Sequence, residues 1–367
     1  MNYCSYAMLN FERKRSDLNK LGEYRSYLNE HPRLLFLFLE ITTRCNLACG
    51  HCGSNCGTAG DNGLLSKQEY FAFLAKLAES FDPNDIMLCV TGGEPLLRKD
   101  IFEIMAYAVS LGFSWGMTSN GTLIDSDIIS RMRESDMKTI SVSLDGLSDT
   151  HDWLRNRPGC FQQALNGIKL LVGAGCFQHV QVTTVVHKNN LYQLDDLYEL
   201  IKKLGCRSWR LTNVDPIGRA NSNPELFLDG REFRILFDFI RAKRVNPSET
   251  LQVTYGCGHY LTPEYERDLR DYYFICGSGV YVASILSNGD IYACLDIERR
   301  SELVQGNILR DDFVDIWRNG FQMFRSDRFE LSGKCKKCSD KSYCRGDSAH
   351  TWNYDTNEPI LCIKEIL

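Results

Sequence analysis

Four of the sixteen cysteines in this 367-residue chain crowd into one short segment. Cys45, Cys49 and Cys52 have the spacing Cys-x3-Cys-x2-Cys, and Cys56 follows closely. Three thiolates at this spacing can bind three irons of a [4Fe–4S] cube and leave the fourth iron open to a small molecule, whereas electron-transfer clusters use four cysteines. A zinc site completed by Cys56 is the alternative, because structural zinc takes four protein ligands. The segment therefore predicts a metal centre.

A second group of cysteines occupies the last third of the chain. Its members are Cys257, Cys276, Cys294, Cys335, Cys338, Cys344 and Cys362. The run Cys-x2-Cys-x5-Cys that starts at Cys335 again predicts bound metal, and its spacing alone also allows structural zinc. The other cysteines are scattered singly, and we interpret them as small apolar packing residues (Cys4, Cys89, Cys160, Cys176 and Cys206).

Composition narrows the class of protein. The N-terminus is too polar for a secretory signal, and secreted disulfide scaffolds are much shorter than this chain. No run of 18 apolar residues predicts a membrane span. A net charge of −5 argues against a nucleic-acid partner, which would favour a basic surface. We therefore expect a cytoplasmic protein with reduced, metal-binding thiols.

Elements that would position these cysteines follow from the hydrophobic pattern between residues 34 and 214. Short apolar runs alternate with amphipathic stretches, which predicts a parallel sheet covered by helices. The predicted strands are 34–42, 85–91, 113–119, 139–145, 180–186 and 208–214, and the predicted helices are 66–81, 100–111, 125–135, 161–174 and 192–204. Six such units cannot close an eight-stranded barrel, so we expect a partial (β/α)6 barrel. The cysteine loop would then lie at the carboxyl ends of the strands, where ligands bind.

The remaining segments predict smaller elements. Residues 1–33 are helical and charged, residues 216–230 look like a linker, and a helix is expected at 231–243. Asn288-Gly289 between two apolar runs predicts a β-hairpin. The expected organisation is an extension (1–33), an α/β barrel core (34–220), a linker and helix (221–256), and a small cysteine-rich α+β domain (257–367).

The sequence CNLACGHC, followed about 40 residues later by Thr91-Gly92-Gly93-Glu94-Pro95, resembles the signature of the radical S-adenosylmethionine (SAM) superfamily. The resemblance implies that the three cysteines of the loop bind a catalytic [4Fe–4S] cluster whose open iron takes SAM. Gly92 and Gly93 would let the backbone approach the ligand. Glu94 would accept hydrogen bonds from the methionine ammonium.

Other SAM contacts implied by the resemblance fall at strand ends. Each of these residues could instead be an ordinary strand cap or a solvated loop residue. They are Ser119 and Asn120 after the third strand, Ser143 and Asp145 at the fourth, and Arg155, which resembles an arginine facing the SAM carboxylate. His51, beside the third cysteine, would stack near the adenine or simply pack.

The C-terminal cysteines resemble the SPASM extension of radical SAM enzymes, which binds auxiliary clusters. Cys276, Gly289 and Cys294 fit its C-x12-G-x4-C element. The resemblance assigns Cys335, Cys338, Cys344 and Cys362 to one cluster, and Cys257, Cys276 and Cys294 to another. Ser348 stands where the fourth ligand of the second cluster is expected. Asp347, Ser348 or His350 would replace it, or one iron would be open.

The resemblance also implies the activity. A reduced cluster would cleave SAM to a 5′-deoxyadenosyl radical, which abstracts hydrogen from a substrate. The expected substrate is a ribosomally made peptide or protein, and the expected electron donor is a protein such as flavodoxin or ferredoxin. Sulfatase-maturing members of the family typically have an Asp directly after the cysteine of the G-x4-C element. Here Leu295 stands between Cys294 and Asp296, so the resemblance argues against sulfatase maturation. The alternatives are radical chemistry on a sugar or cofactor precursor, and a non-catalytic Fe–S or zinc scaffold. No residue is assigned as the catalytic acid or base.

Overall fold

A central sheet organises the molecule. The structure, a computed structural model, describes residues 11–58, 63–245 and 249–367. Within these residues ten strands form one sheet in the order β10-β9-β8-β1-β2-β3-β4-β5-β6-β7. Their bounds are Phe36–Glu40 (β1), Met87–Thr91 (β2), Ser114–Ser119 (β3), Thr139–Ser143 (β4), His179–Val186 (β5), Ser208–Asn213 (β6), Gln252–Tyr255 (β7), Val282–Ile285 (β8), Asp290–Tyr292 (β9) and Gly306–Asn307 (β10). A short antiparallel pair, Trp352–Asn353 (β11) with Glu358–Pro359 (β12), stands apart.

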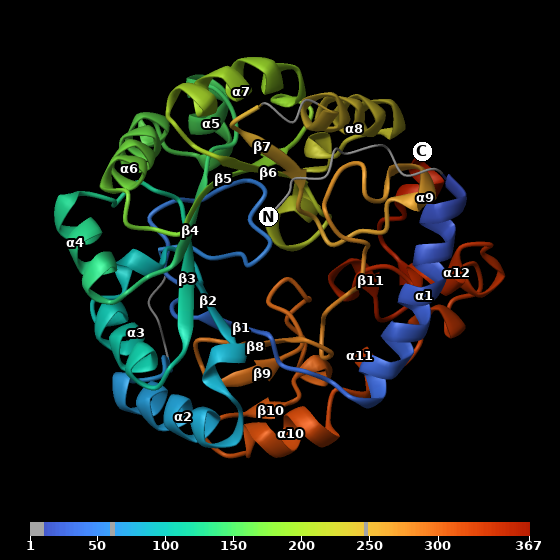
Figure 1. Ribbon diagram of the computed structural model, residues 1–367, viewed down its shortest axis with the longest axis horizontal. Coiled ribbons are helices and arrows are strands. Elements are labelled where there is room, and N and C mark those ends of the chain that lie inside the picture. The colour runs from blue at the N-terminus through green and yellow to red at the C-terminus, as the bar shows by residue number, and fades with distance from the viewer. Residues whose placement is uncertain (1–10, 59–62, 246–248) are drawn as a thin grey trace.

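The six predicted strands are confirmed as β1 to β6, and each pairs in parallel with the next. Helices form an outer ring around them (Figure 1). Alternate strand residues such as Leu37, Leu88 and Trp115 are fully buried toward the helices, as the pleat requires. The helices are Phe11–Glu30 (α1), Lys67–Ser80 (α2), Ile101–Ser110 (α3), Ser126–Glu134 (α4), Ser148–Arg155 (α5), Cys160–Ala174 (α6), Leu194–Lys203 (α7), Gly230–Val245 (α8), Thr262–Tyr265 (α9), Phe313–Asn319 (α10), Gln322–Arg325 (α11), Lys341–Cys344 (α12) and Ile363–Ile366 (α13).

Two local predictions are confirmed in detail. The side chain of Ser66 accepts a hydrogen bond from Glu69 N at 3.2 Å, and Ser66 N donates to the Glu69 carboxylate at 2.6 Å. This capping box starts α2, because it satisfies two backbone donors that the first helical turn leaves free. The hairpin at Asn288-Gly289 joins β8 and β9, and Gly289 has a φ of +90° that suits this turn.

The sheet extends beyond the predicted barrel at both edges. Strand β7 pairs in parallel with β6, in a region where a linker and a helix are expected from the sequence. Strand β8, from the cysteine-rich region, pairs in parallel with β1. The expected domain boundaries stay a prediction, but hydrogen bonds of the main sheet cross them.

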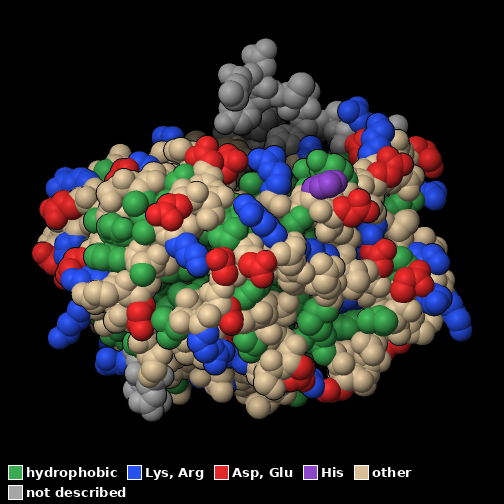
Figure 2. Space-filling model, turned by 90° about the horizontal axis from the view of Figure 1, so that it is seen from below, with side chains coloured by type: hydrophobic (Ala, Val, Ile, Leu, Met, Phe, Trp, Pro, Cys, Tyr) green, Lys and Arg blue, Asp and Glu red, His purple; other side chains and the backbone are tan. Residues whose placement is uncertain are grey.

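Helix α1 lies against the C-terminal elements near α12 (Figure 1). Its Leu18 packs with Tyr260 and Phe274, and its buried Lys14 forms an ion pair with Asp268 at 2.6 Å. On the face seen in Figure 2, Lys and Arg side chains are interspersed with Asp and Glu side chains. Among the described residues, no helix combines the length and apolar character needed to cross a membrane.

Candidate active site

The loop after β1 brings the three predicted thiols together. The side chains of Cys45, Cys49 and Cys52 pack around Leu47 and the fully buried Cys160. The loop thus gathers the three thiols that the motif places at intervals along the chain.

N–H groups point at two of these sulfurs. Leu47 N donates to Cys45 Sγ at 3.5 Å, and Arg155 Nη1 donates to Cys49 Sγ at 3.6 Å. Burial raises the pKa of the Cys45 thiol to about 11, so an unligated Cys45 would stay neutral. Hydrogen bonds to sulfur stabilise thiolates and tune Fe–S clusters, so this donor arrangement fits a thiolate-bound cluster.

Cys56, which the zinc alternative requires, lies beside Cys52. A hydrogen bond from the Cys56 thiol lowers the pKa of Cys52, although burial opposes this shift. Arg219 also favours the Cys52 thiolate through its charge. Four neighbouring sulfurs are compatible with a zinc site as well as with an iron–sulfur cluster, so their proximity alone does not distinguish the two.

The Gly92-Gly93-Glu94 turn after β2 clamps the cysteine loop. Gly93 N donates to Thr42 O at 2.8 Å, and Glu94 N donates to Arg44 O at 2.8 Å. A Cβ on Gly92 would lie 2.3 Å from Thr42 O, and one on Gly93 would lie 2.1 Å from Arg44 O. The two glycines are therefore required for close approach to the backbone of the loop, in addition to the approach to a ligand that the motif implies.

Replacing Gly93 with alanine should displace the cysteine loop. The added methyl group collides with backbone, which cannot move as a flexible side chain would, and overpacking of this kind costs about 1–3 kcal/mol. We expect a lower urea midpoint and less iron bound after reconstitution. Gly173→Ala is the matched control, because a Cβ at this helical position meets nothing within 4 Å. Wild-type iron content in Gly93→Ala would contradict the clamp.

Glu94, Ser119 and Asn120 form one buried network. Ser119 Oγ donates to Glu94 Oε1 and Asn120 N donates to Glu94 Oε2, both at 2.8 Å. Asn120 Nδ2 reaches Asn46 in the cysteine loop at 2.9 Å. Burial raises the pKa of Glu94 although these donors oppose the rise. Glu94 Oε1 also accepts from Leu96 N at 3.3 Å. A carboxylate oxygen can accept two hydrogen bonds, so Oε2, which accepts from Asn120 N, keeps acceptor capacity for an ammonium group.

Asp145 and Arg155 form a fully desolvated ion pair behind Cys49. Arg155 Nε donates to Asp145 Oδ2 at 2.7 Å, while Val185 N donates to Asp145 Oδ1 at 2.8 Å. Burial alone would raise the pKa of Asp145, but the Arg155 guanidinium is the main reason that it falls to about 2. Asp145 therefore stays ionised and holds Arg155 against the Cys49 sulfur.

Two further predicted residues lie near this pair. Ser143 is the last residue of β4 and is half-buried. His51 Nε2 lies 3.8 Å from Asp145 Oδ2, and burial lowers the pKa of His51 to about 3, which keeps its ring neutral. The predicted SAM contacts of Ser143, Asp145, Arg155 and the Gly92 turn stay predictions.

The segment expected to be a linker braces the cysteine loop. Arg219 Nε donates to Cys49 O at 2.8 Å, and Arg219 Nη1 donates to Cys56 O at 2.7 Å. Asn223 Nδ2 donates to Gly50 O at 2.9 Å. Sequence reasoning missed both side chains, because polar residues in a stretch rich in Gly, Asn and Pro are equally typical of solvated loops.

Four of the C-terminal thiols meet around one small cavity. Cys335, Cys338, Cys344 and Cys362 all line it, as the resemblance implies for one cluster. Lys364 Nζ donates to Cys338 Sγ at 3.5 Å, so this sulfur also has an N–H donor. The structure therefore brings the complete predicted set together.

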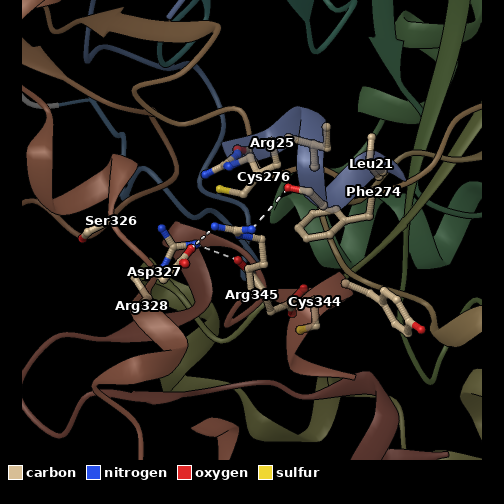
Figure 3. A pocket seen from close by; sticks show the side chains of 13 residues that line it. Leu21, Arg25, Phe274, Cys276, Ser326, Asp327, Arg328, Cys344 and Arg345 are labelled. Atoms are coloured by element: carbon tan, nitrogen blue, oxygen red, sulfur yellow. Dashed lines mark hydrogen bonds and ion pairs between the residues drawn. The ribbon is translucent and has the colours of Figure 1, made fainter. Parts of the chain in front are cut away.

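Cys276 lies among arginines. Figure 3 shows Arg25 of α1 beside it, with Arg328 and Arg345 next to them. Burial opposes ionisation, yet the charges of Arg328 and Arg25 lower the pKa of Cys276 to about 6. Ser278 Oγ lies 3.5 Å from Cys276 Sγ and also forms a hydrogen bond with the neighbouring Cys294. Cys276 and Cys294 are thus adjacent, as predicted.

Cys257 faces a different set of groups. Its Sγ lies 3.3 Å from Asp215 Oδ2, and His350 is a further hydrogen-bond partner. The hydroxyl of Ser348 donates to the carbonyl of Gly258, beside Cys257. His350 is one of the residues expected to replace the missing ligand beside Cys257, whereas Asp215 is a neighbour that the sequence did not predict. The expected role of Cys257 with Cys276 and Cys294 stays a prediction.

A cavity of about 650 Å³ fills the barrel interior. Its lining extends from the first residues of the strands, such as Phe36 and Met87, to Gly92 and His51 beside the cysteine loop. Arg210 of β6 also faces this cavity, and its Nε donates to Thr183 Oγ1 at 3.2 Å. The cavity therefore reaches from the first residues of the strands to the cysteine loop and the Gly92-Gly93-Glu94 turn.

Comparison with known proteins agrees with this geometry. Residues 39–201 match the family model described as the radical SAM superfamily, and residues 276–339 match an iron-sulfur cluster-binding domain, SPASM. The AdoMet-dependent heme synthase of Methanosarcina barkeri is 31% identical and the match covers 90% of this chain and 96% of that protein. The mycofactocin maturase MftC of Mycobacterium ulcerans is also 31% identical, with 84% and 80% covered.

Among solved structures, SuiB of Streptococcus suis bound to S-adenosylmethionine superposes with a TM-score of 0.70 at 20% identity, covering 86% of this chain and 73% of that one. That likeness shows a shared fold. Matches in both sequence segments, together with relatives of at least 30% identity over most of their length, decide against the zinc scaffold. The chain therefore belongs to the radical SAM superfamily and is an enzyme of the group that carries a C-terminal SPASM iron–sulfur domain.

Proposed function

We propose that the protein modifies a ribosomally made peptide or protein by abstracting hydrogen from it inside the barrel cavity. In this proposal Cys45, Cys49 and Cys52 hold the catalytic [4Fe–4S] cluster. Gly92, Gly93, Glu94, Ser119, Asn120, Ser143, Asp145 and Arg155 hold SAM. The bound, reduced cluster supplies the electron that cleaves SAM to a 5′-deoxyadenosyl radical.

The length of the cavity is the observation that carries the peptide proposal. The cavity follows the inner face of β1 from Phe36 to Glu40. Five strand residues span about 16 Å at roughly 3.3 Å each. An extended segment of polypeptide matches such a long lumen, and MftC, a relative with 31% identity, is named a maturase.

Residues of this chain have three tasks in the proposed reaction. The Asp145–Arg155 pair and the Gly92 turn keep the cysteine loop and SAM in a fixed geometry. The barrel wall excludes water and solutes, which a primary radical would otherwise attack. Arg210, whose half-buried side chain lines the cavity and forms no ion pair among the described residues, binds a substrate carboxylate.

The C-terminal cysteines belong to the same proposal. Cys335, Cys338, Cys344 and Cys362 bind one auxiliary cluster, and Cys276 and Cys294 contribute to a second. A protein such as flavodoxin or ferredoxin supplies electrons. We place the enzyme in the cytoplasm, where a reducing environment keeps unligated thiols available for iron.

A second candidate is a cofactor precursor, specifically a tetrapyrrole that carries carboxylates. One observation favours it: the match to the Methanosarcina barkeri heme synthase covers nearly the whole of both chains. Arg210 suits this substrate as well, because its guanidinium would bind a tetrapyrrole carboxylate as readily as a peptide carboxylate.

The test presents both substrates to the same anaerobic, reduced holoenzyme. One sample receives SAM with synthetic peptides encoded by short reading frames beside the gene, and the other receives SAM with an iron tetrapyrrole bearing propionates. Mass spectrometry then follows 5′-deoxyadenosine and the mass of each substrate. A peptide that loses hydrogen supports the proposal, whereas turnover of the tetrapyrrole alone replaces it with the second candidate.

Arg210→Met should weaken binding of whichever carboxylate substrate is used. Methionine keeps most of the apolar contacts of the side chain but removes the charge, and a charge-assisted hydrogen bond contributes about 1.5–3 kcal/mol. We therefore expect KM to rise roughly 10–100-fold, while substrate-free SAM cleavage remains unchanged. Arg207→Met, a change of the same type outside the cavity lining, is the control. An unchanged KM in Arg210→Met would show that Arg210 does not bind the substrate.

A further inference from the structure

Four side chains with metal-binding atoms converge at the wall of the barrel cavity. Asp215 follows β6, Cys257 and His259 follow β7, and His350 comes from the C-terminal region. Their candidate ligand atoms all lie within 4.8 Å of one another. Residues from three separate parts of the chain therefore present oxygen, sulfur and nitrogen atoms to one point.

The contacts within this group centre on one carboxylate. Asp215 Oδ1 lies 2.8 Å from His259 Nε2, and Asp215 Oδ2 lies 3.0 Å from His350 Nε2. Cys257 Sγ is 3.3 Å from the same Oδ2 atom. His259 is fully buried, and the side chains of Asp215 and His350 are only 10% and 11% exposed. A thiol is only a weak hydrogen-bond donor, whereas its thiolate is a strong ligand for Zn²⁺.

A fifth residue orients the group from behind. His259 Nδ1 lies 2.9 Å from Asp347 Oδ2, and the other oxygen of Asp347 accepts from Tyr260 N at 2.8 Å. A histidine that binds metal through one ring nitrogen usually has its other nitrogen held by a carboxylate or carbonyl. Asp347 holds His259 in this way, which leaves Nε2 directed at the other three residues.

We propose that Asp215, Cys257, His259 and His350 bind one divalent metal ion, Zn²⁺ or Fe²⁺, beside the cavity. Two imidazoles, one thiolate and one carboxylate are a donor set that suits these ions and completes a tetrahedral shell. The ion fastens the ends of β6 and β7 to the C-terminal region. The site assigns Cys257 to this ion instead of to the cluster of Cys276 and Cys294, which lie together at Ser278.

The probe is Co²⁺, which replaces Zn²⁺ in such sites and reports thiolate ligation through its absorption spectrum. Full-length protein with its clusters reconstituted anaerobically is first stripped of loosely bound divalent ions with a mild chelator. It is then titrated with Co²⁺. We expect one ion per chain with thiolate-to-cobalt and tetrahedral ligand-field bands. No binding, or binding without thiolate bands, would overturn the proposal.

Variants separate this site from an auxiliary cluster. Cys257→Ser should abolish the thiolate band, and His350→Ala should prevent tight binding, while cluster iron and sulfide stay at wild-type amounts. Asp347→Asn should weaken Co²⁺ binding about 10–100-fold, the usual effect of removing an outer carboxylate partner. Cys89→Ser and His179→Ala change the same residue types elsewhere in the cavity lining and should bind Co²⁺ normally.

Two results would contradict the assignment. Loss of a whole cluster's iron and sulfide in Cys257→Ser would make Cys257 a cluster ligand. Unaltered Co²⁺ spectra in both Cys257→Ser and His350→Ala would place the ion elsewhere. Near-ultraviolet circular dichroism of each variant shows whether it folds, and Asp215→Asn, which preserves the side-chain shape, provides a second test where His350→Ala does not fold. Substrate turnover is not used as a readout, so failure here is distinct from failure of the proposed function.

Discussion

Cys45→Ala will abolish reductive SAM cleavage while the C-terminal cysteines keep their iron. Removing one of three cluster thiolates should release the cluster, about four irons per chain for a [4Fe–4S] cube. We expect 5′-deoxyadenosine to fall to the background without enzyme. Iron analysis and electron paramagnetic resonance of the dithionite-reduced protein should still detect the auxiliary centres, because Cys335, Cys338, Cys344 and Cys362 surround a separate cavity.

Cys176→Ala is the matched control for this experiment. Cys176 is exposed and lies outside both cysteine groups, so the same chemical change should leave iron content and SAM cleavage at wild-type values. SAM cleavage at the wild-type rate in Cys45→Ala would show that this loop does not bind the catalytic cluster. Parallel loss of all iron in Cys45→Ala would show instead that the sites are not independent.

Asp145→Asn should have the largest effect on stability. The substitution leaves the Arg155 guanidinium buried without its carboxylate, and breaking a buried ion pair from one side costs about 3–5 kcal/mol. Arg155 also donates to Cys49 Sγ, so the variant should lose SAM cleavage as well as stability. Equilibrium unfolding in urea and anaerobic SAM cleavage assays measure the two effects.

Two comparisons check the cause of this destabilisation. Asp136→Asn removes the exposed partner of Lys138 and should cost at most about 1 kcal/mol, because surface pairs contribute little. The double variant Asp145→Asn/Arg155→Met should recover part of the loss, since it removes the uncompensated charge together with its partner. A double variant that is destabilised by the sum of the single changes would contradict coupling between the two side chains.

The same pair predicts the direction of a pH effect. The pKa of Asp145 is lowered to about 2 in the folded protein, below its ordinary value near 3.9 when unfolded. Its contribution to stability is therefore complete above about pH 4 and is lost as the pH falls toward 2. The loss in Asp145→Asn should accordingly shrink over this acidic range.

Local signals explain why much of the fold is readable from sequence. The six barrel strands are apolar runs of ordinary length, and Ser66 with Glu69 marks a helix start through contacts only three residues apart. Strand β7 is missed because four residues next to Cys257 resemble a loop as much as a strand. Its identity depends on pairing with β6, which is a tertiary interaction.

In the candidate site, too, the sequence predicts residues that lie close together along the chain and misses residues that only the tertiary structure brings together. Spacing identifies Cys45, Cys49 and Cys52, because the three thiols lie on one loop. The carboxylate of Asp215 meets His350 only when the chain folds, and nothing in the residues around either position indicates the other. The contacts of Arg219 with the cysteine loop could likewise not be predicted, because its acceptors are backbone carbonyls, which every sequence provides.

The pairing of β8 with β1 has a consequence for the order in which the enzyme is assembled. Strand β1 leads directly into the cysteine loop, yet its second hydrogen-bonding neighbour comes from residues 282–285. During synthesis β1 therefore keeps one edge unpaired until the ribosome has passed residue 285, about three-quarters of the way along the chain, because this parallel pairing is non-local. Before that point the cysteine loop follows a strand that lacks its second neighbour, so a cluster inserted early would enter a loop without its final support.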